Sequence, residues 1–218
     1  MFIWIFIAAT LAFTITGCNS STASAVSELT AESKPATQYT IDANQEVYAL
    51  LDFEDTAEFE NATKGLLASP DTLDICDENG KVVWSQTAYA FLDQDAPDTA
   101  NPSLWRDTQL NHIYGLFEVT DGIYQVRGYD MSNVTFIKGD TGWIVVDPLM
   151  SVECAQAALA LVEENLGTFP VKAVIYRHSH VDHFGGVKGI VSEEEVQAGN
   201  VQVIAPEGFE KYAKHRQR

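Results

Sequence analysis

Basic residues are scarce in this sequence. Of 218 residues, 13 are Lys or Arg and 31 are Asp or Glu, which gives a formal net charge of −18 and a pI of about 4.4. Proteins that bind nucleic acids use Lys and Arg to neutralise phosphates, so this balance excludes a nucleic-acid partner. Surface acidity of this kind is typical of a solvated exterior. It stays compatible with an anionic substrate, because a nearby metal charge outweighs distant carboxylates.

Cysteine is rare as well, with three residues at Cys18, Cys76 and Cys154. Cys76 and Cys154 have no neighbours at the spacing of metal ligands, so thiolate coordination is not indicated. In an oxidising compartment these two can pair with each other. We interpret both as structural and expect one of them to lie in a buried helix.

Long apolar runs are confined to the N-terminus. The stretch MFIWIFIAATLAFTI (1–15) is shorter than the roughly 20 residues of a membrane-spanning helix, and small residues follow it. ITGC (15–18) resembles a lipobox with Cys18 as the lipidated residue, whereas ASA (23–25) offers an ordinary signal-peptidase site. We therefore predict a signal peptide over 1–25, a flexible tether over 26–40, and a periplasmic or cell-surface protein that touches the membrane only through lipid at Cys18. The stretch lacks the basic residues with which a signal peptide normally begins. An uncleaved anchor is the alternative.

Histidine is also scarce, yet three of the five residues fall within six positions, at His178, His180 and His183. VKAVIY (171–176) before them is typical of a buried strand, and a pair of glycines follows. Residues two apart on an extended segment project to the same side, so His178 and His180 can bind one ion. Asp182 and His183 follow in a turn and can face a second ion. This donor set suits zinc, and also iron or manganese. The alternative is a surface loop that is merely rich in histidine.

The order of predicted elements places this motif in an α/β layered fold. Helical spacing covers 55–68, a turn and short strand cover 79–86, and a loop leads into a helix over 96–111. Alternating segments broken at glycines predict an antiparallel meander over 115–148. An amphipathic helix over 151–167 and the strand over 171–176 follow. The stretch after the glycines, VKGIV, is compatible with a helix or a strand.

Two residues near the motif have less certain roles. Asp147 stands at the end of the last meander strand, where it can orient a metal ligand or form the turn or helix cap before Pro148. Arg177 lies inside the motif, and we expect its side chain to point away from the pair on either side.

The segments GDTGWIVVDP and HSHVDHFGG, joined by a helix and a strand, resemble the metallo-β-lactamase fold, an αββα sandwich with a His-x-His-x-Asp-His signature. APDTANPSLWRDTQLN, GLFEVTDGIYQVRGYDMSNVTFIKGDTGWIVVDPL and VIYRHSHVDHFGGVKG further resemble the alkyl sulfatase branch of that superfamily. The resemblance runs from about 40 to 212, so we assign 41–212 to the N-terminal part of such a catalytic domain and 213–218 to a tail that does not match.

The resemblance implies a hydrolase that uses two zinc ions to cleave sulfate esters of alkyl chains such as dodecyl sulfate. The resemblance implies that His178 and His180 hold one zinc ion, while Asp182 and His183 hold the other. Asp182 also acts in catalysis, because it borders the water that the metals activate. The family further implies a homodimer for the full-length enzyme.

The sequence departs from this family in its length. Chains of the family are longer, and their remaining metal ligands lie downstream, so we expect this chain to hold roughly the first half of the sandwich and to be inactive alone. The candidates to complete the site are His215 and five late glutamates, which we interpret as solvated charges: Glu193, Glu194, Glu195, Glu207 and Glu210. A lactonase or thioesterase of the same fold and a catalytically silent zinc-binding lipoprotein fragment are the alternatives.

Overall fold

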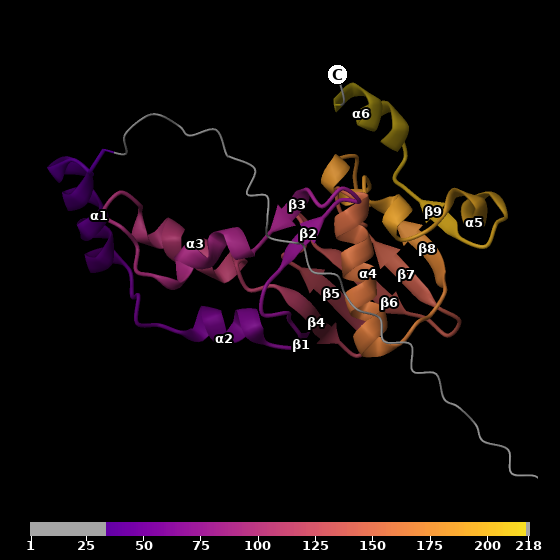
Figure 1. The fold of residues 1–218 in the computed structure, drawn as a ribbon, viewed down its shortest axis with the longest axis horizontal. Helices are drawn as coiled ribbons and strands as arrows, with labels where there is room; N and C mark the ends of the chain where they lie inside the picture. Colours follow the sequence, from indigo (N-terminus) through magenta and orange to yellow (C-terminus); the bar gives the residue numbers. More distant parts are fainter. Residues whose placement is uncertain (1–33, 217–218) are drawn as a thin grey trace, which may run out of the picture.

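A mixed sheet of seven strands forms the centre of the molecule in the computed structural model, which describes residues 34–216 (Figure 1). Four strands form the predicted antiparallel meander, each paired with its neighbour in the chain: β4 (Gly115–Thr120), β5 (Ile123–Arg127), β6 (Val134–Lys138) and β7 (Trp143–Val146). Gly122, at φ 74°, forms the turn between β4 and β5 in a backbone region that glycine enters without strain. The meander prediction is confirmed.

The second half of the sheet is parallel. Helix α4 (Val152–Leu166) joins β7 to β8 (Val171–Ile175), and β9 (Gln202–Ile204) pairs with the far side of β8. The strand order is β1-β4-β5-β6-β7-β8-β9, where β1 is Leu66–Ala68. Ser151 begins α4 by accepting a hydrogen bond from the backbone N–H of Cys154, and Gly167 ends the helix at φ 89°.

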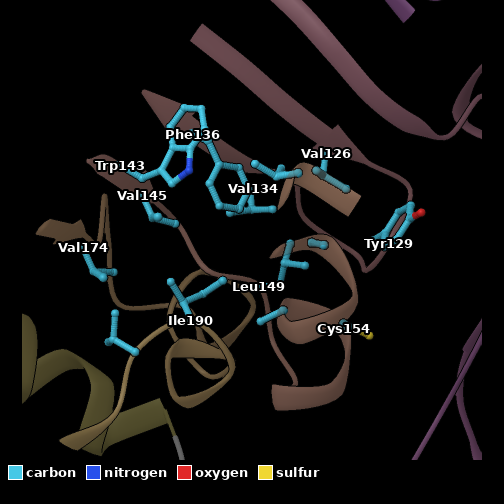
Figure 2. Packing of buried hydrophobic residues seen from close by; sticks show 14 of the residues in the cluster. Val126, Tyr129, Val134, Phe136, Trp143, Val145, Leu149, Cys154, Val174 and Ile190 are labelled. Atoms are coloured by element: carbon cyan, nitrogen blue, oxygen red, sulfur yellow. The ribbon is translucent and has the colours of Figure 1, made fainter. Parts of the chain in front are cut away.

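The core lies between α4 and one face of the sheet (Figure 2). Trp143 is fully buried there, and its ring meets those of Tyr124, Phe136 and Phe169 edge to face. Small residues on α4, Ala155 and Ala158, are also fully buried, so the helix approaches the sheet closely. These contacts fix the carboxyl ends of β7 and β8, where the predicted ligands begin.

The N-terminal part of the described chain forms a loosely packed arm beside the sheet (Figure 1). Helices α1 and α2 have no buried residue, and α3 buries only Pro102. The arm consists of α1 (Gln38–Leu50), α2 (Ala57–Thr63), the 3₁₀ helix η1 (Thr87–Asp93) and α3 (Pro102–Asn111). The hairpin of β2 (Asp74–Cys76) and β3 (Val82–Ser85) packs instead on the core, where Leu73 and Ile75 are buried. The hairpin reaches the sheet through Trp84, whose indole N–H donates to the carbonyl of Gly128 at 2.8 Å.

The structure corrects three details of the sequence predictions. The helix expected over 55–68 ends at Thr63, and Leu66 and Leu67 belong to β1, where they pair with β4. The stretch after the glycines is a 3₁₀ turn, η3 (Val187–Gly189), that leads to α5 (Glu193–Gln197). Cys154 lies buried in α4, as expected for one cysteine, but it is free, so it does not pair with Cys76.

The predicted signal peptide and Cys18 lie outside the described residues. Helix α1 begins at Gln38, so the last positions of the predicted 26–40 tether are helical. Among residues 34–216, we find no helix with the length and apolar character needed to cross a bilayer. The last element within the described residues is α6 (Phe209–Arg216), which includes the first four residues of the predicted 213–218 tail.

Candidate metal centre

The four predicted metal ligands lie in one loop that begins where β8 ends. The N–H of Tyr176 still donates to Ile204 of β9, at 2.9 Å, and the chain then leaves the sheet. It turns back through a short 3₁₀ helix, η2 (Val181–His183), and reaches Gly185 and Gly186. An added Cβ at Gly185 would lie 2.2 Å from the carbonyl oxygen of Met150, so only glycine permits this approach to the chain after β7.

The structure brings the three imidazoles of the motif together. Nε2 of His178 lies 3.1 Å from Nδ1 of His180, and the ring centroids of His178 and His183 are 4.1 Å apart. Partial burial and the neighbouring imidazoles of His183 and His180 lower the pKa of His178 from its ordinary value. The neutral form, which is the form that binds metal, is therefore favoured at neutral pH.

His183 lies between two carboxylates. Its Nδ1 is 2.9 Å from Oδ2 of Asp147, and its Nε2 is 3.0 Å from Oδ2 of Asp182. Because an ionised carboxylate only accepts, each of the two contacts calls for a hydrogen on the imidazole, and the contact with the buried Asp147 keeps one on Nδ1 when Nε2 gives up its own to bind a ligand. Nε2 is then the nitrogen that remains for a ligand on the side of Asp182.

Asp147 holds this arrangement from the end of β7. Its side chain is 1% exposed, and it accepts hydrogen bonds from the backbone N–H of Arg177 at 2.9 Å and from Nε of the same residue. Its backbone carbonyl accepts from Leu149, so it also forms the turn before α4, while the cap of that helix is Ser151. The sequence left open whether Asp147 orients a metal ligand or forms the turn or cap before Pro148. Its carboxylate contacts His183, so the side chain orients that histidine.

Arg177 departs from the sequence expectation. Its side chain turns back toward Asp147 instead of pointing away, and one terminal nitrogen lies 3.5 Å from Nδ1 of His183. The guanidinium neutralises the buried Asp147 carboxylate, which would otherwise be costly to bury. In the sequence, the position of Arg177 next to the motif was the only sign that it compensates the charge of Asp147.

Two further polar residues support the loop and were missed in the sequence, Ser132 by direct contact and Asp130 through the chain after β7. Asp130 and Ser132, at 5% and 8% exposure, lie between β5 and β6, and the Ser132 hydroxyl donates to the backbone carbonyl of Asp182. The sequence signal was weak, because Asp and Ser are ordinary turn residues.

A pocket of about 430 Å³ opens beside these residues. Part of the loop forms one wall, and polar side chains of β5, β6 and the segment between them form the other. The lining residues are Gln125, Met131, Ser132, Asn133, Thr135, Val146, Asp147, Arg177, Asp182 and His183.

The chemical types of the four side chains match those that bind zinc in proteins. Three imidazoles and one carboxylate, all from one loop, are ligands that zinc accepts, and Asp147 sets the tautomer of His183 that leaves Nε2 for a ligand. As they stand, the side chains bond to one another, and within residues 34–216 no three His, Cys, Asp or Glu side chains are already arranged as a cage. A metal ion therefore requires these side chains to turn from one another.

Three of the five late glutamates have partners other than the loop. Glu195 accepts from Ser192 in a capping box at the start of α5, and these hydrogen bonds lower its pKa. Glu193 pairs with Lys188 at 3.9 Å, and Glu210 with Lys214 at 3.2 Å. These contacts agree with our interpretation of the glutamates as surface charges.

Comparison with known proteins identifies the type of fold to which the region around the loop is similar. Residues 127–218 match the family profile described as the metallo-beta-lactamase superfamily. The domain is thus of the metallo-beta-lactamase fold, with mixed α/β content, as the sequence motif predicted.

Proteins similar to most of this chain include alkylsulfatases. The chain is 50% identical over 183 residues to an (R)-specific secondary-alkylsulfatase of Pseudomonas sp., a match that covers 84% of this chain and 28% of the relative. An alkyl/aryl-sulfatase of Saccharomyces cerevisiae is 50% identical over 171 residues, covering 78% and 26%. A solved structure of a stereoselective inverting sec-alkylsulfatase from Pseudomonas sp. superposes with a TM-score of 0.79 at 51% identity, over 84% of this chain and 29% of that one. The predicted resemblance to the N-terminal part of alkylsulfatases is confirmed.

Proposed function

We propose that this chain carries part of the active site of a zinc-dependent hydrolase that cleaves sulfate esters of alkyl chains. One observation carries the proposal. The His and Asp cluster lies within the segment that is 50% identical to an alkylsulfatase. The chain spans about 28% of that relative's length, so the activity is proposed for the whole protein and not for this chain alone.

In this proposal His178 and His180 hold one zinc ion, and Asp182 and His183 hold the second. Zinc, when bound, supplies Lewis-acid chemistry that lowers the pKa of water and polarises an ester oxygen. Asp182 orients the attacking water by accepting one of its hydrogen bonds. The side chain is suited to this because it is 28% exposed and lines the pocket.

Arg177 and Asp147 position these groups. The Asp147 carboxylate keeps the hydrogen of His183 on Nδ1, and the guanidinium of Arg177 compensates the buried charge of Asp147. The Arg177 side chain is also 63% exposed at the edge of the pocket. It therefore offers an anionic sulfate group a positive charge in a protein that is acidic overall.

The proposal is tested with a chimera in which the remainder of the Pseudomonas relative follows residue 212 of this chain. Loaded with zinc, it should release sulfate from dodecyl sulfate faster than it hydrolyses a thioester or a lactone. His178→Ala or His180→Ala should lower its zinc content and abolish turnover, because each substitution removes one imidazole nitrogen that would bind the metal directly. A preference for the thioester or lactone would assign another hydrolase of the same fold. Bound zinc without turnover of any ester would favour a silent zinc-binding protein.

Export, lipid attachment at Cys18 and dimerisation of the complete enzyme are part of the same proposal. Export and lipid attachment are motivated by the apolar run that ends in Ile-Thr-Gly-Cys, and dimerisation by the resemblance to alkylsulfatases. Labelling with a radioactive fatty acid should mark the wild type and not Cys18→Ala, whereas equal labelling would remove the lipid anchor. Sedimentation of the chimera should give a dimer.

A further inference from the structure

The loop between β5 and β6 crosses to the metal-binding loop through buried polar contacts. This segment, Gly128–Asn133, contains Asp130 and Ser132, which are both nearly inaccessible to solvent. The Ser132 hydroxyl donates to the backbone carbonyl of Asp182, in the middle of the proposed ligand set. A direct contact therefore links the meander to the backbone that carries Asp182 and His183.

Asp130 ties the same segment to the chain after β7. One of its carboxylate oxygens accepts the N–H of Met131 at 2.6 Å, and the other accepts those of Met150 at 2.9 Å and Ser151 at 3.3 Å. Ser151 begins α4, where the positive end of the helix dipole favours a carboxylate. Charged hydrogen bonds of this kind are about twice as strong as neutral ones.

The chain after β7 in turn contacts the end of the metal-binding loop. The N–H of Gly186 donates to the carbonyl of Leu149 at 2.9 Å, and an added Cβ at Gly186 would lie 2.3 Å from the carbonyl oxygen of Pro148. Three segments thus form a closed ring of contacts: Gly128–Asn133, Asp147–Ser151 and Arg177–Gly186.

The ring is also anchored on its outer side. The carbonyl of Gly128 accepts from the indole of Trp84 at 2.8 Å and from the amide of Gln86 at 2.7 Å. Gln86, 6% exposed, bonds through its other amide atom to Nδ1 of His112 at 2.8 Å. The segment that carries Asp130 and Ser132 is therefore held at both ends.

We propose that Asp130 and Ser132 are positioning residues for the metal-binding loop, acting through its backbone and through the chain after β7. Neither is one of the proposed metal ligands, so their substitution should weaken metal binding by loosening the loop. This inference rests on the proposed function in one respect, because it assumes that residues 178–183 bind the metal. Its first readout needs no metal.

That readout is amide hydrogen exchange of the whole 218-residue chain without zinc. Ser132→Ala deletes only the hydroxyl that reaches Asp182, and exchange should accelerate in the peptide that spans 180–186. Ser132→Thr keeps a hydroxyl and should restore protection. Ser69→Ala, at an exposed serine, should change nothing in this peptide. Unchanged exchange in Ser132→Ala would overturn the proposal.

The second readout is zinc affinity, measured by competition with a chromophoric chelator. Ser132→Ala should lower affinity roughly tenfold, the lower range for residues that support metal ligands. Asp130→Asn should lower it further, because an amide cannot accept at both positions. Val162→Ala, in the core on α4, controls for stability, because it should destabilise the chain without altering affinity.

The outcomes separate the two proposals. If the wild type binds no zinc while exchange responds as expected, the metal-based function fails and the positioning role of Ser132 stands. If affinity falls equally in Ser132→Ala and Val162→Ala, the effect is general destabilisation and the positioning role is wrong. If Asp130→Asn does not fold, the comparison of Ser132→Ala with Ser132→Thr still shows whether the hydroxyl positions the metal-binding loop.

Discussion

The sheet with α4 and the N-terminal arm differ in how they use their apolar residues. The sheet buries Trp143, Phe136 and Val145 completely, whereas the arm leaves Tyr39 85% exposed and Leu50 79% exposed. The proposed ligands all follow β8 of the sheet, and Asp147 directly follows β7, so the closely packed region carries the site. The β2–β3 hairpin and the start of η1 contribute through hydrogen bonds to Gly128. Precise side-chain placement thus coincides with dense packing, as expected where a rigid scaffold positions loops.

The largest expected effect is loss of the packed core. Trp143→Ala should lower the free energy of unfolding by about 3–5 kcal/mol, because it empties the centre of the aromatic cluster. Tyr39→Ala on α1 should stay within about 0.5 kcal/mol. Urea denaturation measures both. Similar losses for the two variants would mean that the arm is as tightly packed as the sheet.

A smaller effect is expected at the glycines that let two loops meet. Gly185→Ala should destabilise the chain by about 1–3 kcal/mol, since its Cβ would overlap the carbonyl of Met150. It should also weaken zinc binding. Gly80→Ala meets no atom within 4 Å, and its left-handed backbone (φ 79°) should cost about 1 kcal/mol with zinc affinity unchanged. Unaltered zinc affinity in Gly185→Ala would separate the loop contact from the site.

Asp147→Asn tests how the packed region orients a ligand. The amide retains the size of Asp147 but weakens its hold on Nδ1 of His183 and leaves Arg177 without its partner charge. Zinc affinity should fall about 10- to 100-fold, as for other residues that support metal ligands. Chelator competition measures it, with Asp140→Asn in an exposed turn as the matched control. Equal affinities would place Asp147 outside the metal centre.

The smallest perturbation uses Cys154 as a probe of packing. Burial, with a smaller contribution from the charge of Asp130, raises the pKa of this thiol from 9.0 to about 11. The reactive thiolate is therefore rare at pH 8, and alkylation should accelerate until the pH approaches 11. In urea the profile should shift to the ordinary pKa. Peptide mapping follows Cys154 alone, and fast labelling of the folded chain at pH 8 would contradict its burial.

The sequence predicted local elements better than contacts between distant segments. Glycine breaks and alternating residues identified β4 to β7, and the His-x-His-x-Asp-His spacing identified the loop, because both depend on local periodicity. Arg177 was misjudged, since its partner Asp147 is distant in sequence and only the parallel pairing of β7 with β8 brings them together. Helix α1 was missed because it has no buried face, and therefore no apolar stripe to recognise.

The central claim is that His178, His180, Asp182 and His183 form a metal centre at the carboxyl end of the packed sheet. Zinc binding to the 218-residue chain, measured by chelator competition, tests it most directly. The account predicts weak but measurable binding that is lost in His178→Ala and in His180→Ala. It predicts that His112→Ala, which removes the imidazole bound to Gln86 in the arm, retains zinc. Equal binding by all variants, or loss of zinc only in His112→Ala, would contradict it.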